Sequence, residues 1–210
     1  MARIYNGIYV DSYYHENDRE REHLLFLGRV SHAKGTADAI TIAKNKGLKL
    51  KIAGKVDEAN RAYFDEMVKP ELDNDLIEFL GEVSHEEKIQ LLREAICALY
   101  PIAFEKPFGL VMAEALASGT PVIALKRGSV PEVLDSKTGV VGSSLEELLD
   151  RFDEVFDIDS NNCVSRAKSL FGKERMVDQY EVLYKNLKIE NNSSSPVSWQ
   201  QVQPIKQCER

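Results

Sequence analysis

Residues 24–35 read Leu24-Leu25-Phe26-Leu27-Gly28-Arg29-Val30-Ser31-His32-Ala33-Lys34-Gly35. The short, unbroken apolar run before Gly28 is typical of a strand buried on both faces, as in a parallel sheet. After this strand, the two glycines permit tight turns, and Arg29 and Lys34 place two cations on one loop. The pattern is equally consistent with a loop that binds a phosphate or diphosphate group and with a solvated turn that carries two unrelated basic residues.

Apolar runs and helical periods alternate along the rest of the chain, which predicts an α/β fold with a doubly wound parallel sheet. A capping box at Ser84-His85-Glu86-Glu87 marks one helix start. Further strands are expected at 48–53, 76–80, 96–100, 121–125 and 138–141. Helices are expected at 36–46, 58–68, 84–93, 109–118, 144–156, 160–169 and 173–187.

The two ends of the chain differ from this core in composition. We expect residues 1–23 to form a polar linker with one short strand at 7–10, and residues 24–189 to form the domain. Residues 190–210 are rich in Asn, Ser and Gln, which predicts a disordered tail.

Charge and cysteine content narrow the class of protein. The 210 residues carry 27 basic and 34 acidic side chains, a net charge of −7, which argues against non-specific binding to nucleic acid or anionic membrane. Three cysteines at unpatterned spacings do not predict a disulfide framework. With no apolar run near the ~20 residues of a membrane span, we expect a cytoplasmic protein. Peripheral binding at the inner membrane face remains an open alternative.

A second notable stretch runs from Phe104 to Pro121 and reads FEKPFGLVMAEALASGTP. Gly109 opens a helix of small and apolar residues that Glu114 interrupts. A carboxylate in such a helix must be hydrogen-bonded or face a cleft, because burying it unpaired is costly. Glu114 therefore either grips two adjacent hydroxyls of a sugar or, as is more common for such a residue, braces a neighbouring loop.

Taken together, these segments resemble group 1 retaining glycosyltransferases. The resemblance covers about residues 4–187, and its motifs are Phe26–Gly35, Phe79–Ser84, Pro107–Ala124, Gly128–Val133 and Thr138-Gly139. It implies the GT-B fold, in which two Rossmann-like domains face each other across a cleft. This chain is similar to the C-terminal, donor-binding domain, and residues 3–8 resemble the crossover from the N-terminal acceptor domain. The chain would then be an excised piece or a half-enzyme.

The resemblance also implies which residues bind the donor. Arg29 and Lys34 would hold the diphosphate, and Glu114 would grip the ribose hydroxyls. Substrate-binding residues carried over in this way are Gly28, Val83, Phe108, Gly109, Leu110, Val111 and Glu114.

One position departs from the family pattern. The family has a first carboxylate eight residues before Glu114, where this chain has Lys106. Either the adjacent Glu105 supplies that carboxylate, as a catalytic residue beside Arg29 and Lys34, or Lys106 points into the site as a third cation.

The activity that the resemblance implies is transfer of a hexose from a nucleoside-diphosphate sugar to a hydroxyl acceptor, a glycan or a lipid, with retention. It would be incomplete without an N-terminal acceptor domain in cis or in trans, and it needs no metal and no other cofactor. Two other functions stay open: a non-catalytic nucleotide-sugar-binding subunit or degenerate half-enzyme, and a sugar-nucleotide epimerase.

Overall fold

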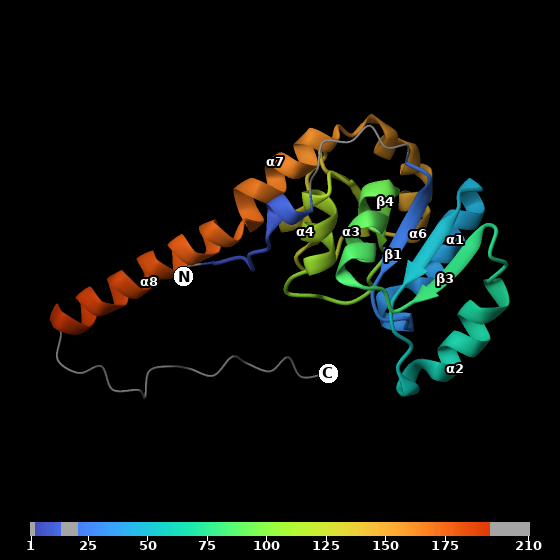
Figure 1. Ribbon diagram of the computed structural model, residues 1–210, viewed down its shortest axis with the longest axis horizontal. Coiled ribbons are helices and arrows are strands. Elements are labelled where there is room, and N and C mark those ends of the chain that lie inside the picture. The colour runs from blue at the N-terminus through green and yellow to red at the C-terminus, as the bar shows by residue number, and fades with distance from the viewer. Residues whose placement is uncertain (1–2, 14–20, 194–210) are drawn as a thin grey trace.

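A computed structural model describes residues 3–13 and 21–193 and shows six parallel strands in the order β3-β2-β1-β4-β5-β6, as Figure 1 shows in part. This is the strand order of the Rossmann fold, so the predicted doubly wound parallel sheet is confirmed. The strands are β1 (His23–Leu27), β2 (Leu50–Ala53), β3 (Ile77–Gly81), β4 (Ala95–Tyr100), β5 (Val122–Leu125) and β6 (Gly139–Gly142).

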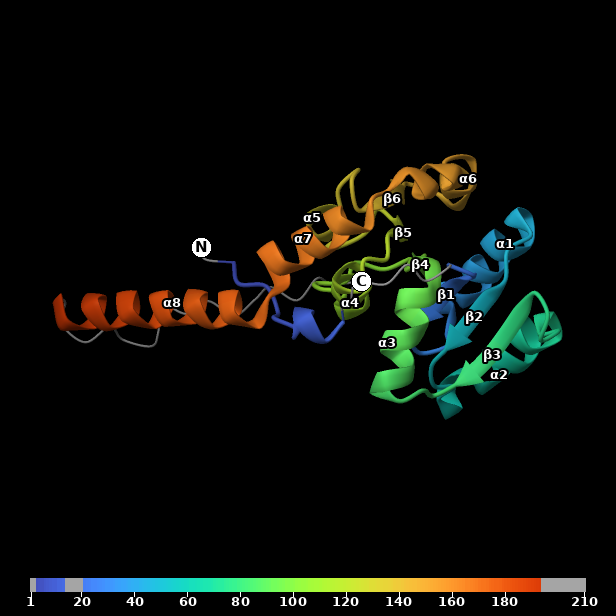
Figure 2. The ribbon, with the colours of Figure 1, turned by 45° about the horizontal axis from the view of Figure 1, so that its top comes forward.

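Helices cover both faces of this sheet (Figure 2). They are α1 (Thr36–Lys46), α2 (Arg61–Tyr63), α3 (His85–Glu94), α4 (Leu110–Ala117), α5 (Val130–Val133), α6 (Leu145–Asp150), α7 (Ser160–Phe171) and α8 (Lys173–Ser193). The predicted capping box opens α3: the Glu87 amide donates to Ser84 Oγ at 3.2 Å, and the Ser84 amide donates to the Glu87 carboxylate at 2.7 Å.

Two apolar cores form because alternate residues of the buried strands point to opposite faces. Leu24 and Phe26 of β1 pack with α1, α6 and the turn at Phe152–Asp157, whereas Leu25 faces the core that contains α3, α4 and α7. No helix within residues 3–13 and 21–193 combines the length and apolar character needed to cross a bilayer.

The structure differs from the sequence-based expectation in three segments. The predicted helix at 58–68 is present and continues to residue 71, but its helical type changes from 3₁₀ (Glu58–Asn60) to α (α2), to π (Phe64–Val68) and back to 3₁₀ (Lys69–Glu71). The predicted helix at 144–156 is divided into α6 and a 3₁₀ turn at Phe152–Asp157. The predicted strand at 7–10 is wrong: Ile8 makes one isolated bridge to Gly172, and a 3₁₀ turn follows at Val10–Ser12. A longer pairing is prevented because Gly172 is the single extended residue between α7 and α8.

The N-terminal segment nevertheless packs into the domain. Ile8, Val10 and Tyr13 are buried against the α4 and α7 face of the sheet. At the other end of the chain, α8 extends away from the sheet (Figures 1 and 2). This helix continues to Ser193, although the sequence predicts that the disordered tail begins at residue 190. The rest of that tail, 194–210, lies outside the described residues.

Candidate functional site

Two cavities lie side by side at the carboxyl ends of the central strands. Leu27, Gly28 and Arg29, at the end of β1, line both of them. In open α/β sheets ligands bind at this edge, where the strand order reverses between β1 and β4. The loop after β1, which the sequence singles out, therefore lies at the centre of the site.

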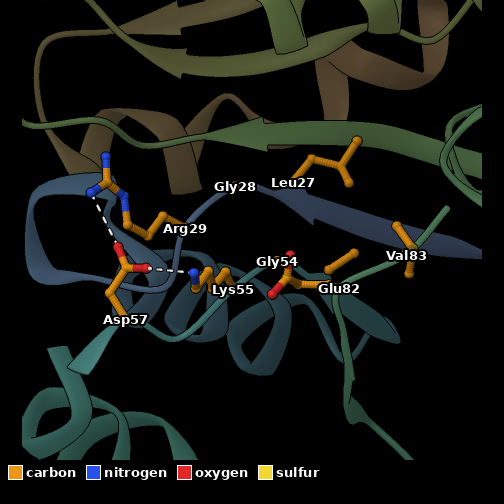
Figure 3. A pocket seen from close by; sticks show the side chains of 9 residues that line it. Leu27, Gly28, Arg29, Gly54, Lys55, Asp57, Glu82 and Val83 are labelled. Carbon is orange, nitrogen blue, oxygen red and sulfur yellow. Dashed lines mark hydrogen bonds and ion pairs between the residues drawn. The ribbon is translucent and has the colours of Figure 1, made fainter. Parts of the chain in front are cut away.

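The first cavity, of about 510 Å³, opens toward β2 and β3. Besides the end of β1 it is lined by Ala53, Gly54, Lys55, Asp57, Glu82 and Val83. Figure 3 shows Arg29 and Lys55 converging on the Asp57 carboxylate, with N–O distances of 3.1 and 3.6 Å. Val83, which the resemblance assigns to substrate binding, lines this cavity, and so does Asp57, a charged residue that the sequence pattern did not indicate.

The second cavity, of about 240 Å³, lies between the ends of β1 and β4 and the start of α4. Its other lining residues are Phe26, Lys34, Leu99, Tyr100, Ile102, Lys106 and Val111. It therefore gathers Arg29, Lys34 and Lys106 around one space, although Lys106 comes from a loop more than 70 residues further along the chain.

These three cations interact. Partial burial first, and then the neighbouring side chains of Lys106 and Arg29, together lower the pKa of Lys34 to about 8. The Lys34 ammonium also lies 5.1 Å from the centre of the Phe104 ring. A site that pushes a lysine pKa down is one that a negatively charged ligand would stabilise.

The loop that carries Glu105 and Lys106 is tied to the turn before α5. The Glu105 carboxylate accepts the Gly128 amide proton, and the Ser129 amide donates to the Lys106 carbonyl at 2.9 Å. A Cβ on Gly128, whose φ is +50°, would lie 2.3 Å from that carbonyl oxygen, so only glycine fits. Glu105 is absent from the lining of both cavities, whereas Lys106 lines the second.

The start of α4 offers backbone donors to the same space. The first amides of a helix have no intrahelical partner, and Val111 in the first turn lines the second cavity. The N-cap residue Gly109 has no side chain that could occupy these donors. Leu110 is exposed, and Phe108 packs with Tyr5 and Phe171 in an aromatic cluster rather than at either cavity.

Glu114 lies on α4 and is already paired. Its carboxylate accepts from Lys88 Nζ at 2.7 Å and from Tyr13 Oη at 2.9 Å. Burial and this carboxylate raise the pKa of Tyr13, which keeps the phenol protonated as a donor. Lys88 and Tyr13 are further residues that the sequence pattern did not indicate. In the described ranges, no group of three or more His, Cys, Asp or Glu side chains is placed to share a metal ion.

Comparisons with known proteins agree with this architecture. The family described as "Glycosyl transferases group 1" matches residues 14–169, so the chain belongs to that family. Its sheet and helices form the Rossmann-like fold found in GT-B glycosyltransferases.

Particular relatives match parts of longer proteins. Glycogen synthase of Mycobacterium tuberculosis is 33% identical over 130 residues, which are 56% of this chain and 29% of that protein. The structure of AviGT4, a glycosyltransferase involved in avilamycin A biosynthesis, superposes with a TM-score of 0.71 at 26% sequence identity. The match covers 88% of this chain and 57% of the AviGT4 chain. Anabaena HepE, solved in complex with UDP-glucose, superposes with a TM-score of 0.72 at 19% sequence identity. The match covers 89% of this chain and 57% of the HepE chain. This chain therefore spans less than two thirds of each of these relatives.

Proposed function

We propose that this chain is the donor-binding domain of a retaining glycosyltransferase that moves a hexose from a nucleoside-diphosphate sugar to a hydroxyl acceptor, a glycan or a lipid. Full activity requires an N-terminal acceptor domain in cis or in trans. The observation that carries the proposal is that Arg29, Lys34 and Val111, in the first turn of α4, all line the second cavity, while Arg29 also lines the first. The UDP-glucose complex of HepE, a protein of similar fold, supports it.

The chemistry follows from where charge develops. When the bond to the anomeric carbon breaks, negative charge grows on the leaving diphosphate, and cations and helix-terminal amides already in place stabilise it. Arg29 and Lys34 supply the cations, and the amides of Leu110 and Val111 receive the distal phosphate. Positioning of the acceptor hydroxyl falls to the acceptor domain.

Along the donor, we place the nucleoside in the first cavity, beside Val83, and the diphosphate on the Gly28–Arg29 loop that both cavities share. Glu114 accepts the ribose hydroxyls after exchanging its hydrogen bond from Tyr13 or Lys88. Glu105 remains a candidate for contact with the sugar only if its hydrogen bond to Gly128 opens.

Calorimetry with UDP and GDP tests the binding step. Charge-assisted hydrogen bonds contribute about 1.5–3 kcal/mol each, so Arg29→Ala and Lys34→Ala should each weaken diphosphate binding by roughly tenfold or more. Lys137→Ala removes a lysine from an exposed turn and should leave the affinity unchanged. Unchanged affinity in both site variants would contradict the proposal.

A non-catalytic nucleotide-sugar-binding subunit is the second candidate. Lys106 favours it, because a cation occupies the position at which the resemblance implies a carboxylate. One experiment distinguishes these candidate functions. The chain is incubated with a donor that it binds, and hydrolysis, epimerisation and transfer to added acceptors are followed. Binding without any of the three reactions, even after an acceptor domain is supplied, supports the subunit; epimerisation without an acceptor supports an epimerase.

A further inference from the structure

The second cavity has a strong excess of positive charge. Its lining contains Arg29, Lys34 and Lys106 and, among the described residues, no acidic side chain. Arg29 is shared with the first cavity and is ion-paired there with Asp57. Lys34 and Lys106 line the second cavity but not the first, and the Lys106 side chain helps to lower the pKa of Lys34.

The same cavity holds an unused hydrogen-bond donor. Tyr100 lines it at the end of β4, is only 5% exposed, and its hydroxyl has no hydrogen-bond partner in the described part of the chain. A Cβ on Gly109 would lie 2.5 Å from this hydroxyl, which places it at the start of α4. Burial raises the pKa of Tyr100 to about 12, so the phenol stays protonated at ordinary pH. Buried polar groups are normally hydrogen-bonded, whereas this hydroxyl is covered by neighbouring atoms at the start of α4 although Tyr100 lines the cavity.

The position of the two cavities assigns the second one to a part of the donor. If the nucleoside occupies the first cavity and the diphosphate the shared loop at Gly28–Arg29, the group attached beyond the diphosphate reaches the second cavity. That group is the transferred sugar. Arg29 and Lys34, which we assign to the diphosphate, match its two negative charges, which leaves Lys106 and the Tyr100 hydroxyl for the sugar itself.

We propose that Lys106 and Tyr100 select a donor whose sugar carries a carboxylate, a hexuronic acid, in preference to the neutral hexose. This inference rests on the proposed function and names the substrate class of its site. A sugar carboxylate accepts from the Lys106 ammonium and from the Tyr100 hydroxyl, and it offsets the cation excess that a neutral sugar leaves in place. Lys106 is thus a specificity-determining residue, at the position where the resemblance implies a carboxylate.

The test compares donors that differ only in the carboxylate, with the full chain, by calorimetry. The pairs are UDP-glucuronic acid with UDP-glucose and GDP-mannuronic acid with GDP-mannose, and free UDP, GDP, ADP and dTDP are measured alongside. For the nucleotide that binds, we expect the uronic acid donor to bind about tenfold more tightly than its neutral counterpart, the gain from one charge-assisted contact.

Substitutions test which residues cause the preference for the uronic acid donor. Lys106→Met should abolish most of it while changing the affinity for the free nucleotide less than about threefold, and Lys106→Glu should reverse it. Tyr100→Phe should reduce the preference by a few-fold, and Lys137→Met, a matched loss of one lysine charge, should leave it intact. The ratio of the two affinities is the readout, because a merely structural loss weakens both donors equally.

The outcomes separate the two proposals. If none of UDP, GDP, ADP and dTDP binds, the proposed function fails and the inference fails with it. If a nucleotide binds but the wild-type chain prefers the neutral donor, or Lys106→Met keeps the wild-type ratio, the proposed function stands and the inference is overturned.

Discussion

Raising the pH from about 7 to about 9 should weaken nucleotide-sugar binding by about tenfold, because Lys34 loses its charge in this interval. Burial and the neighbouring cations Lys106 and Arg29 lower its pKa to about 8 in the ligand-free chain. An exposed lysine keeps its charge beyond pH 10 and would show no such effect. The phosphates of a nucleotide sugar do not titrate over this range, and the Lys34→Arg variant controls for any deprotonation of the base toward its upper end.

The magnitude follows from linkage. A bound diphosphate favours the charged ammonium and therefore raises the Lys34 pKa in the complex. Between the pKa of the free chain and that of the complex, binding takes up one proton, and affinity falls up to tenfold for each pH unit. Lys34 is about nine-tenths charged at pH 7 and about one-tenth charged at pH 9 in the free chain, hence the loss of about tenfold.

Calorimetry at a series of pH values, with ionic strength held constant, measures this slope. Lys34→Arg keeps its charge at every pH used and should bind with a flat profile. Lys106→Met removes the largest neighbouring charge, so the Lys34 pKa should rise and the loss of affinity should move to higher pH. A flat profile for the wild-type chain, or the same slope in Lys34→Arg, would refute this reasoning.

Three further predictions concern neighbouring groups. Glu114→Gln should weaken nucleoside diphosphate binding several-fold and leave inorganic pyrophosphate binding unchanged in calorimetry; equal losses would mean that Glu114 only braces Lys88. Asp57→Asn should raise pyrophosphate affinity by roughly two- to fivefold, because Arg29 is released from its ion pair; a decrease would show that Asp57 positions Arg29. His23 is buried and its pKa is lowered to about 4, below the 6.5 of an unfolded chain, so urea titrations should show stability falling as pH drops below 6.5 toward 4, by up to roughly 3 kcal/mol. Variant His23→Gln should lose this pH dependence.

Much of the fold could be predicted from the sequence because its signals are local. The apolar run before Gly28 ends a strand where expected, and the Ser84 capping box opens α3. The segment after β2 shows the limit of this approach. A helix is expected there at 58–68, and the segment is helical, but its type changes between 3₁₀, α and π along its length, and Pro70 lies in its last, 3₁₀ turn.

The site was predictable only where one loop carries several chemical groups. Arg29 and Lys34 lie five residues apart and are recognisable in the sequence as a cationic loop. Tyr100 at the end of a buried strand looks like an ordinary core residue, and Asp57 looks like one charge in a polar loop. Their places at the two cavities depend on which strands are neighbours in the sheet, and no local pattern encodes that pairing.

The junction between α7 and α8 also fixes the beginning of the domain. The Ile8 amide donates to the Phe171 carbonyl at 2.7 Å, and the Lys173 amide donates to the Ile8 carbonyl at 3.1 Å. A Cβ on Gly7 would lie 2.7 Å from the Lys173 Cα, so the two backbones are in direct contact. The chain therefore comes into the Rossmann-like domain and leaves it through a single point. Whatever is joined before Gly7 and the long helix after Gly172 are therefore attached to the domain at neighbouring backbone positions.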